Sequence, residues 1–261
     1  MRYLPFVLLL GLACAKAPES RTDRTPAADC DAAVHGIENG SLAVAGHAVT
    51  YTGSGAITLA RTGACRQLAL ALTGADGAPP VRMEFLRSYG IVRLDLPARL
   101  ERVDVADTTF ADPLATAAYV VHGRAGGYFL DVHVVQPALA LARAAAGNIT
   151  LELAPGGGAV PTAAPRARNV VVLEPRQGSA TYPLTIRGYA RTFEANVQAW
   201  ITSGDSTHAK TFTTAADWST TWGEFEITIP RGPSGDVQLF VGEESAKDGT
   251  PIGVTIPLRM P

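Results

Sequence analysis

The sequence lacks an excess of charge of either sign, and this absence excludes several classes of partner. It has 22 lysines and arginines against 24 aspartates and glutamates, a net charge of −2. Nucleic-acid binding depends on basic side chains that displace counterions from phosphates, so nucleic acid is not an expected partner. With 47% hydrophobic and 18% charged residues, the 261-residue chain also lacks the composition of a disordered protein. We expect a mostly folded chain of one large or two modest domains.

Enzyme signatures are missing as well. The sequence contains no Gly-x-Ser-x-Gly elbow, no His-Glu-x-x-His pair and no phosphate-binding loop. The residues that come closest to a catalytic group are Asp131 and His133, whose side chains share a face if residues 128–135 form a strand. His122 could lie across the hairpin from them. Because strand faces turned to water normally alternate polar with apolar residues, we expect Asp131 and His133 outside. The side chains expected inside are those of Phe129, Val132 and Val134. We predict a protein that is not an enzyme and needs no metal or cofactor.

Long hydrophobic runs are absent, apart from a short one near the amino terminus. Residues 4–12 are mostly apolar, follow Arg2 and stop shortly before Cys14. The run is about half of the roughly 20 residues that a membrane-spanning helix needs. It resembles a bacterial lipoprotein signal peptide, which implies removal of residues 1–13 and acylation of Cys14. We therefore expect an extracytoplasmic protein anchored by lipid to the bacterial cell membrane or outer membrane; the alternative is ordinary secretion.

Cysteine is scarce, with three in the chain. If Cys14 carries lipid, Cys30 and Cys65 form an even pair in an oxidising compartment, where disulfides persist. A bridge between them would stabilise the fold by about 3 to 4 kcal/mol on the chain-entropy model. The alternative is that Cys65 is a free buried thiol and Cys30 lies in a mobile segment.

Glycine and proline, in contrast, are plentiful, with 26 and 18 residues. Together with many valines and threonines they favour short strands joined by tight turns, so we expect an all-β protein. Residues 14–29 have the composition of a flexible tether, and the Gly/Pro-rich residues 156–168 that of a linker between domains. We place a β-rich amino-terminal domain at residues 30–155 and a second domain at residues 169–261.

One stretch of the amino-terminal domain departs from the strand pattern. Residues 137–146 are rich in alanine and leucine, begin with proline and are followed by Gly147. These features predict the one short helix of the chain, although the alternation of Leu139 and Leu141 also fits a strand.

The carboxy-terminal domain combines short strand-like stretches with frequent turns, the spacing of a small immunoglobulin-like sandwich. Four of its segments resemble, in order, the immunoglobulin-like domain of bacterial spore germination proteins, of the GerMN-associated type. These segments are Pro183 to Asn196, Trp222 to Phe225, Glu244 to Gly249 and Val254 to Pro257. The resemblance implies a non-enzymatic, extracytoplasmic β-sandwich, and it carries no catalytic or ligand-binding residues over to this chain.

Aromatic and acidic residues of this domain have structural interpretations. We expect the large aromatic side chains to lie in the core or at its corners. They are Phe193, Trp200, Trp222 and Phe225. Glu194 is expected to hold a turn. Glu243, Glu244 and Asp248 resemble a calcium loop, but their spacing matches no EF-hand, so we predict a solvated turn.

The amino-terminal strands resemble, in their order, an AMIN-like domain, which implies contact with peptidoglycan or another envelope component. The segments concerned are Gln67 to Leu72, Gly90 to Pro97, Tyr119 to His122, Tyr128 to His133 and Ile149 to Leu153. We predict a membrane-anchored lipoprotein that acts as a non-catalytic binding or scaffolding module of the cell envelope, with peptidoglycan or envelope proteins as partners. The alternatives are an enzyme or a small-ligand carrier located in the amino-terminal domain.

Overall fold

A computed structural model describes most of the chain. The described residues are 41–44, 50–53, 57–62, 65–71, 73–74, 81–96, 99–103, 108–145 and 148–261. Within these ranges the protein is all-β, which confirms the predicted fold class, and its one helical segment is the short 3-10 turn η1 (Phe193–Ala195). The predicted signal peptide and tether lie outside the described residues. Among the residues described, no helix has the length and apolar character needed to span a membrane.

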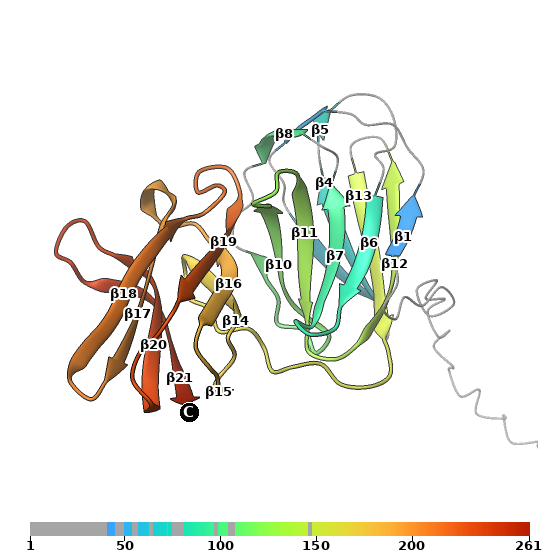
Figure 1. The fold of residues 1–261 in the computed structure, drawn as a ribbon. Coiled ribbons are helices and arrows are strands. Elements are labelled where there is room, and N and C mark those ends of the chain that lie inside the picture. The colour runs from blue at the N-terminus through green and yellow to red at the C-terminus, as the bar shows by residue number, and fades with distance from the viewer. Residues whose placement is uncertain are drawn as a thin grey trace, which may run out of the picture.

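The amino-terminal domain is built from two facing sheets (Figure 1). Its first sheet runs in the order β1 (Ser41–Val44), β6 (Val81–Leu86), β7 (Ile91–Leu96), β11 (Tyr128–Val134) and β10 (Ala115–His122), with β9 (Thr108–Thr109) paired to β10. The second runs β12 (Ala138–Ala145), β13 (Asn148–Pro155), β4 (Cys65–Ala71) and β3 (Ile57–Thr62). A small third sheet joins β5 (Thr73–Gly74), β2 (Thr50–Gly53) and β8 (Arg99–Val103).

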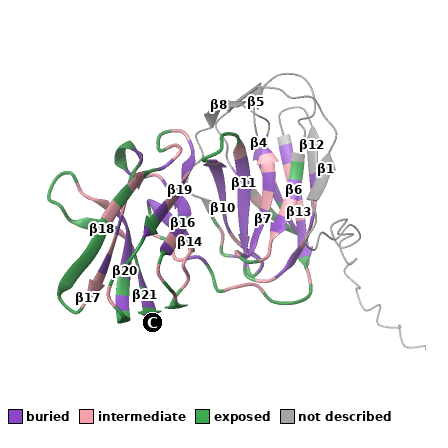
Figure 2. Ribbon diagram, in the orientation of Figure 1, coloured by how far each residue is buried: buried purple, intermediate pink, exposed green. Residues whose placement is uncertain are grey.

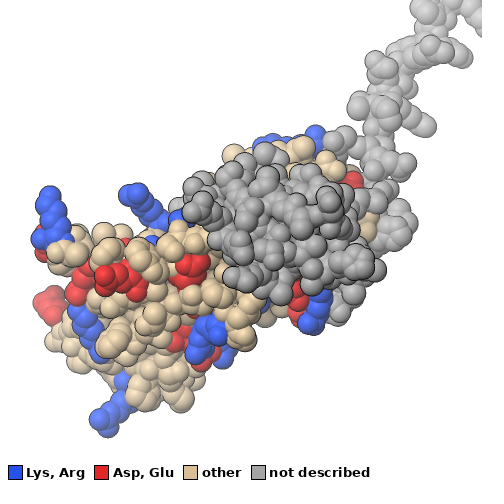
Figure 3. Space-filling view, turned by 90° about the horizontal axis from the view of Figure 1, so that it is seen from above, with Lys and Arg blue, Asp and Glu red and all other residues tan. Residues whose placement is uncertain are grey.

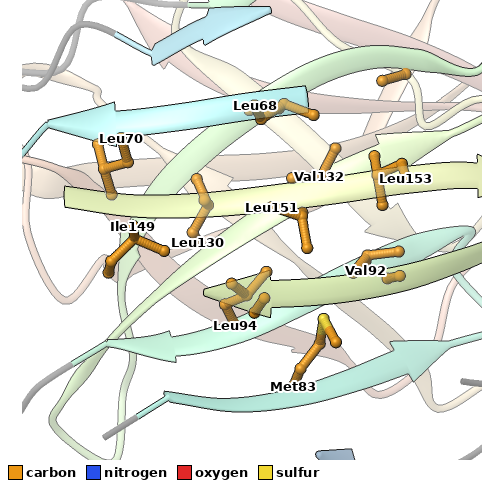
Figure 4. Close-up of a cluster of buried hydrophobic side chains, with 14 of the residues drawn as sticks. Leu68, Leu70, Met83, Val92, Leu94, Leu130, Val132, Ile149, Leu151 and Leu153 are labelled. Carbon is orange, nitrogen blue, oxygen red and sulfur yellow. The ribbon is translucent and has the colours of Figure 1, made fainter. Parts of the chain in front are cut away.

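Alternate residues of the two facing sheets fill the space between them. Leu68 and Leu70 of β4 meet Leu94 of β7 and Leu130 of β11, and all four are buried (Figure 4). This packing follows from the two-residue period of a strand, which sends every second side chain to the same face. The amino-terminal core is therefore a sandwich interior closed by aliphatic side chains.

The predicted helix at residues 137–146 is wrong, because residues 138–145 form strand β12. The strand pairs with β13 along its full length, from Ala138 with Pro155 to Ala145 with Asn148. Ala138, Ala140 and Ala142 point into the sandwich core. Helix propensity is a weak preference, and here the two-residue alternation and the burial of these alanines outweigh it.

The carboxy-terminal domain is a second sandwich. One layer contains β14 (Val170–Glu174), β16 (Leu184–Ala190) and β19 (Trp222–Ile229). The other runs β15 (Gly178–Ser179), β21 (Pro251–Met260), β20 (Gly235–Glu244), β17 (Asn196–Ser203) and β18 (Ser206–Thr214). Buried residues line the inner sides of these strands, whereas β18 at the edge is largely exposed (Figure 2).

The two domains share one sheet. Strand β10 pairs in parallel with β19, with Val121 opposite Trp222 and His122 opposite Gly223. This pairing continues the first amino-terminal sheet into β19, β16 and β14, so the strands of both domains form a nine-stranded sheet. Figure 1 shows β19, β16 and β14 beside β10 at the centre of the molecule.

The Gly/Pro-rich segment at residues 156–168 is irregular, and it packs against both domains. Val160 contacts the amino-terminal core, and Ala164 is buried in the cluster between the domains. Arg166 forms an isolated bridge to Val171. The segment thus lies along the protein surface as a packed connection, while its role as a domain boundary stays a prediction.

Candidate functional site

Asp131 and His133 lie in the interior, so the prediction that they face solvent is wrong. Asp131 is 0% exposed and His133 is 7% exposed. The reason is that β11 is covered on both faces: Leu130 and Val132 point into the amino-terminal core, while Phe129 and the two polar residues point toward the carboxy-terminal domain. Phe129 therefore shares a face with Asp131, and not with Val132 as expected.

The Asp131 carboxylate is held by one residue from each domain. Arg93 Nε and Nη2 donate to Oδ1 and Oδ2, each at 2.8 Å, and the Tyr189 hydroxyl donates to Oδ2. The Arg93 guanidinium also lies 3.6 Å from the centre of the Phe129 ring. Burial, followed by the charge of Asp131, raises the pKa of Tyr189 well above its ordinary value. A carboxylate that is closed to solvent and paired in this way is a structural group.

His133 is neutral in the folded protein. Burial lowers its pKa from 6.5 to about 4. The ring packs edge-on against Tyr119 and Tyr189, with centroid distances of 5.1 and 6.1 Å. Its buried Nε2 has no hydrogen-bond partner among the described residues. The environment of this imidazole consists of ring contacts from both domains.

His122 does not join Asp131 and His133, which corrects the expected three-residue group. In the β10–β11 hairpin it lies opposite Tyr128, while Asp131 lies opposite Tyr119. The His122 ring stacks on Tyr128 at 4.5 Å and is partly exposed. Register therefore separates these side chains, because they belong to opposite faces of the sheet.

The surrounding contacts show that this region joins the domains. Trp222 packs edge-on against Tyr119 with ring centroids 5.1 Å apart. The Tyr89 hydroxyl donates to Glu174 Oε1 at 2.7 Å, and the Arg124 backbone N–H donates to Glu224 Oε2 at 3.0 Å. We call Arg93, Phe129, Asp131, His133, Tyr189 and Trp222 the closed cluster.

An open cleft of about 550 Å³ lies on the carboxy-terminal domain. It is lined by Arg168, Asn169, Arg191, Phe193, Trp218, Glu243 and Ile252, which we call the aromatic cleft. Phe193 is 60% exposed and Trp218 41%, with ring centroids 5.7 Å apart and ring planes 70° apart. Exposed apolar clusters rimmed by polar residues are typical of interaction sites.

The prediction that Phe193 packs in the core or at one of its corners is therefore wrong, because its ring is largely exposed, whereas two of the other three aromatics lie in the core. Trp222 and Phe225 are buried. Trp200 is half-buried and stacks on Phe240 at 3.9 Å, with Lys210 over its ring at 5.0 Å. Phe193 differs because it begins the η1 turn between β16 and β17, where the chain leaves the sandwich.

Hydrogen bonds fix the backbone that presents Phe193. Glu243 Oε2 accepts from the Phe193 N–H at 2.6 Å, and Glu243 Oε1 accepts from Asn169 Nδ2 at 2.5 Å. The next two residues, Glu194 and Ala195, have φ angles of 53° and 60°. Left-handed backbone is uncommon for residues other than glycine and is concentrated at functional sites. Glu194 lies in this turn with its side chain exposed, so its predicted role in holding the turn stays a prediction.

A second network presents Trp218. The Asp217 carboxylate accepts from the backbone N–H groups of Trp218, Ser219 and Thr221 at 2.6, 3.0 and 2.9 Å. Burial raises the pKa of Asp217, but these bonds outweigh it and hold the pKa below its ordinary value. Gly223 lies against this loop so closely that a Cβ there would be 2.2 Å from the Asp217 carbonyl oxygen. The loop is thus rigid although its tryptophan is exposed.

Some polar groups of the aromatic cleft have hydrogen-bond partners within the described structure and others do not. Both oxygens of Glu243 already accept hydrogen bonds, and the two other charged residues of the lining are arginines. Asn169 is 7% exposed, and its Oδ1 has no hydrogen-bond partner among the described residues. Charges of both signs are interspersed over the face of the domain that Figure 3 presents.

The acidic residues near Gly249 are separated into different interactions. Glu244 pairs with Lys210 at 2.8 Å, Glu243 belongs to the aromatic cleft, and Asp248 accepts from the Thr250 N–H at 3.1 Å. Within the described ranges, no group of three or more His, Cys, Asp or Glu side chains is arranged to hold a metal ion.

Of the three cysteines, the structure describes Cys65. It is buried at the start of β4 and is disulfide-bonded. Cys14 and Cys30 lie outside the described residues, so lipidation of Cys14 and the Cys30–Cys65 pairing stay predictions.

Comparison with known families identifies the domain that carries the cleft. Residues 169–250 match the family model of the immunoglobulin-like domain of bacterial spore germination. The carboxy-terminal domain is an immunoglobulin-like domain of this family. Such domains are not typically catalytic, and the match confirms the resemblance seen in the sequence. No curated protein and no solved structure matches the chain.

Proposed function

We propose that this protein is a non-catalytic binding module of the bacterial cell envelope, held outside the cytoplasm by lipid on Cys14. The aromatic cleft of the immunoglobulin-like domain is its binding surface. The observation that carries this proposal is the pair of exposed rings, Phe193 and Trp218, each fixed by a hydrogen-bonded carboxylate behind it. Rigid aromatic side chains bind with little loss of conformational entropy, so such a surface is prepared for a ligand.

The closed cluster supports the same function by orienting the cleft. The β10–β19 pairing and the Arg93–Asp131–Tyr189 contacts bind the two domains to each other. The cleft therefore keeps one orientation relative to the amino-terminal domain. A lipid at Cys14 would raise the local concentration of the whole unit near envelope components, so that weak binding suffices.

The enzyme alternative rested on Asp131 and His133, which are buried between the domains. The carrier alternative needs a ligand space in the amino-terminal domain, whereas side chains from both sheets meet across its core (Figure 4). We therefore prefer the binding module. The AMIN-like resemblance of residues 30–155 would give this unit a second contact with the envelope.

Co-sedimentation of the full-length Cys14→Ser chain, which no lipid can hold, with bacterial envelope fragments containing both wall and membrane tests the proposal. The variants below are made in this background. The double variant Phe193→Ala/Trp218→Ala should lose retention. Phe212→Ala, which removes an exposed ring of β18 outside the cleft, should retain it. Equal retention of both variants, or none by the Cys14→Ser chain itself, would contradict the proposal.

Mass spectrometry of the mature protein tests the anchor separately. A chain that begins at acylated Cys14 and is released from membranes by Cys14→Ser is expected. An unmodified chain that begins at Met1 would contradict the lipid anchor.

A further inference from the structure

We infer that the aromatic cleft binds a carboxylate-bearing sugar unit, an inference that rests on the proposed function. The charge of the lining is the first reason. Arg168 and Arg191 line the cleft, and no hydrogen bond or ion pair in the described structure joins Arg168 to an acidic side chain. The one acidic residue of the lining, Glu243, already accepts from Asn169 and Phe193. A carboxylate ligand matches this set, because guanidinium groups form strong charge-assisted hydrogen bonds with carboxylates.

The shape of the aromatic pair is the second reason. The planes of Phe193 and Trp218 are 70° apart, so the two rings form a flat surface and an adjoining wall. A pyranose ring has an apolar face of C–H groups that can lie on an aromatic ring, while its hydroxyl groups project to the sides. The cavity of about 550 Å³ falls within the range of small-ligand sites and has room for one or two sugar rings.

The third reason is an unused acceptor. Asn169 Oδ1 is buried without a hydrogen-bond partner among the described residues, while Nδ2 of the same side chain donates to Glu243. A buried acceptor left unpaired is costly, so a ligand that supplies a donor gains affinity there. A sugar hydroxyl or an N-acetyl N–H would supply that donor.

A sugar fits these features better than a peptide does. Peptides commonly bind by adding a strand to a sheet edge or by laying a helix in a long groove. The aromatic cleft instead lies where strand ends, the η1 turn and the 217–221 loop come together. A carboxylated sugar combines an apolar face, hydroxyl donors and an anionic group within a single ring-sized ligand.

Calorimetric titration of the full-length chain with two matched disaccharides tests this inference. The acidic probe joins N-acetylglucosamine to N-acetylmuramic acid, and the neutral probe is di-N-acetylchitobiose, which lacks the carboxylate. We expect the acidic probe to bind about tenfold more tightly, as one charge-assisted hydrogen bond allows. Arg168→Gln should remove that preference, and Trp218→Ala should abolish binding of both probes.

Matched controls are available outside the cleft. Arg231→Gln removes an exposed arginine and Phe212→Ala an exposed ring, and neither residue lines the aromatic cleft. Both variants should bind like the unmodified chain, and unchanged far-ultraviolet circular dichroism with an unchanged melting temperature would show that Trp218→Ala keeps its fold.

Three outcomes would overturn the inference. They are equal affinity for the two disaccharides, tight binding of an acidic peptide in place of the sugar, and no sugar binding although Trp218 remains necessary for envelope retention. The last result leaves the proposed function standing. Failure of the chain with an intact cleft to bind either the sugars or the envelope fragments would overturn the inference together with the proposed function.

Discussion

The closed cluster and the aromatic cleft use the same kinds of residue for different purposes. Each combines arginine, a carboxylate and paired aromatic rings. In the closed cluster, Asp131 is 0% exposed and accepts from both Arg93 and Tyr189. In the aromatic cleft, Phe193 and Trp218 are open to solvent, and Asn169 Oδ1 has no hydrogen-bond partner within the described part of the chain.

The difference between them lies in what completes each set of contacts. In the closed cluster, each domain supplies hydrogen-bond partners for polar groups of the other. The cluster therefore contributes to the stability of the protein and to the orientation of its domains. In the aromatic cleft the protein holds the backbone rigid but leaves ring faces and an acceptor unmatched, as a ligand site requires. Substitutions in the first region should therefore change stability, and those in the second should change binding.

The largest effect is expected from Asp131→Ala. This change leaves the Arg93 guanidinium and the Tyr189 hydroxyl without their partner between the domains. Removing one member of a buried pair costs about 3 to 5 kcal/mol, and the loss here should be near the lower end because Arg93 is 20% exposed. Denaturant unfolding measures it, and independent melting of the two domains should accompany it.

The control for this variant is Glu226→Ala, which removes two solvent-exposed ion pairs, one with Arg187 and one with Arg124. Surface pairs contribute less than about 1 kcal/mol, so this variant should be nearly neutral. Similar losses of unfolding free energy in the two variants would contradict the distinction between the buried contacts of the closed cluster and exposed ion pairs.

Acidification should weaken the closed cluster through His133. In the unfolded chain this imidazole gains a proton near pH 6.5, whereas in the folded protein it stays neutral until about pH 4. Unfolding between these values takes up a proton, so the free energy of unfolding should fall as the pH drops from 6.5 to 4. The full loss is about 3 kcal/mol at 1.36 kcal/mol per pKa unit.

His133→Gln isolates this contribution, because glutamine does not titrate. Subtracting its pH profile of unfolding from that of the unmodified chain cancels the shared carboxylates. A difference that does not vary between pH 6.5 and 4 would show that His133 is accessible to protons in the folded state.

The fate of His133 illustrates how far the sequence predicts this structure. Two-residue alternation was sufficient to predict an all-β chain, and turn spacing with the family resemblance predicted the second sandwich. The expectation that polar residues of a strand face solvent is wrong for β11, because it assumes that one face of the strand is exposed. Tyr128 to Val134 is apolar except for Asp131 and His133, and Val170 to Leu173 is wholly apolar; such runs are typical of strands covered on both faces.

The sequence contains weaker signals for the aromatic cleft than for the fold. Phe193 and Trp218 come from separate loops, and an exposed aromatic has no sequence pattern that separates it from a buried one. Their proximity depends on Asn169, Glu243 and Asp217, which hydrogen-bond across long or irregular connections. Long-range register of this kind cannot be obtained from local periodicity.

A smaller effect is expected from Tyr189→Phe, which removes one donor to Asp131 and leaves the ring contacts in place. The loss should be about 1 to 1.5 kcal/mol, the usual value of one hydrogen bond with an allowance for the charged acceptor. Tyr182→Phe, which removes a weaker 3.3 Å bond to the Pro233 carbonyl, is the matched control and should lose less. A larger loss for the control would contradict the assignment of Tyr189 to the joint between domains.

The smallest effect on stability is expected from Phe193→Ala/Trp218→Ala. The two rings are exposed and contact each other edge-on, so their loss should cost less than about 1 kcal/mol of unfolding free energy. Thermal melting beside Phe212→Ala provides the comparison, and a loss as large as that of Asp131→Ala would place these rings in the core.

The most direct test of the whole account measures envelope retention and unfolding free energy on the same preparation of the Phe193→Ala/Trp218→Ala variant, made in the Cys14→Ser background so that no lipid holds it. The account predicts that retention is lost while stability stays within about 1 kcal/mol of the unmodified chain. Retention at the unmodified level, with the fold intact, would contradict the claim that this cleft is the binding surface.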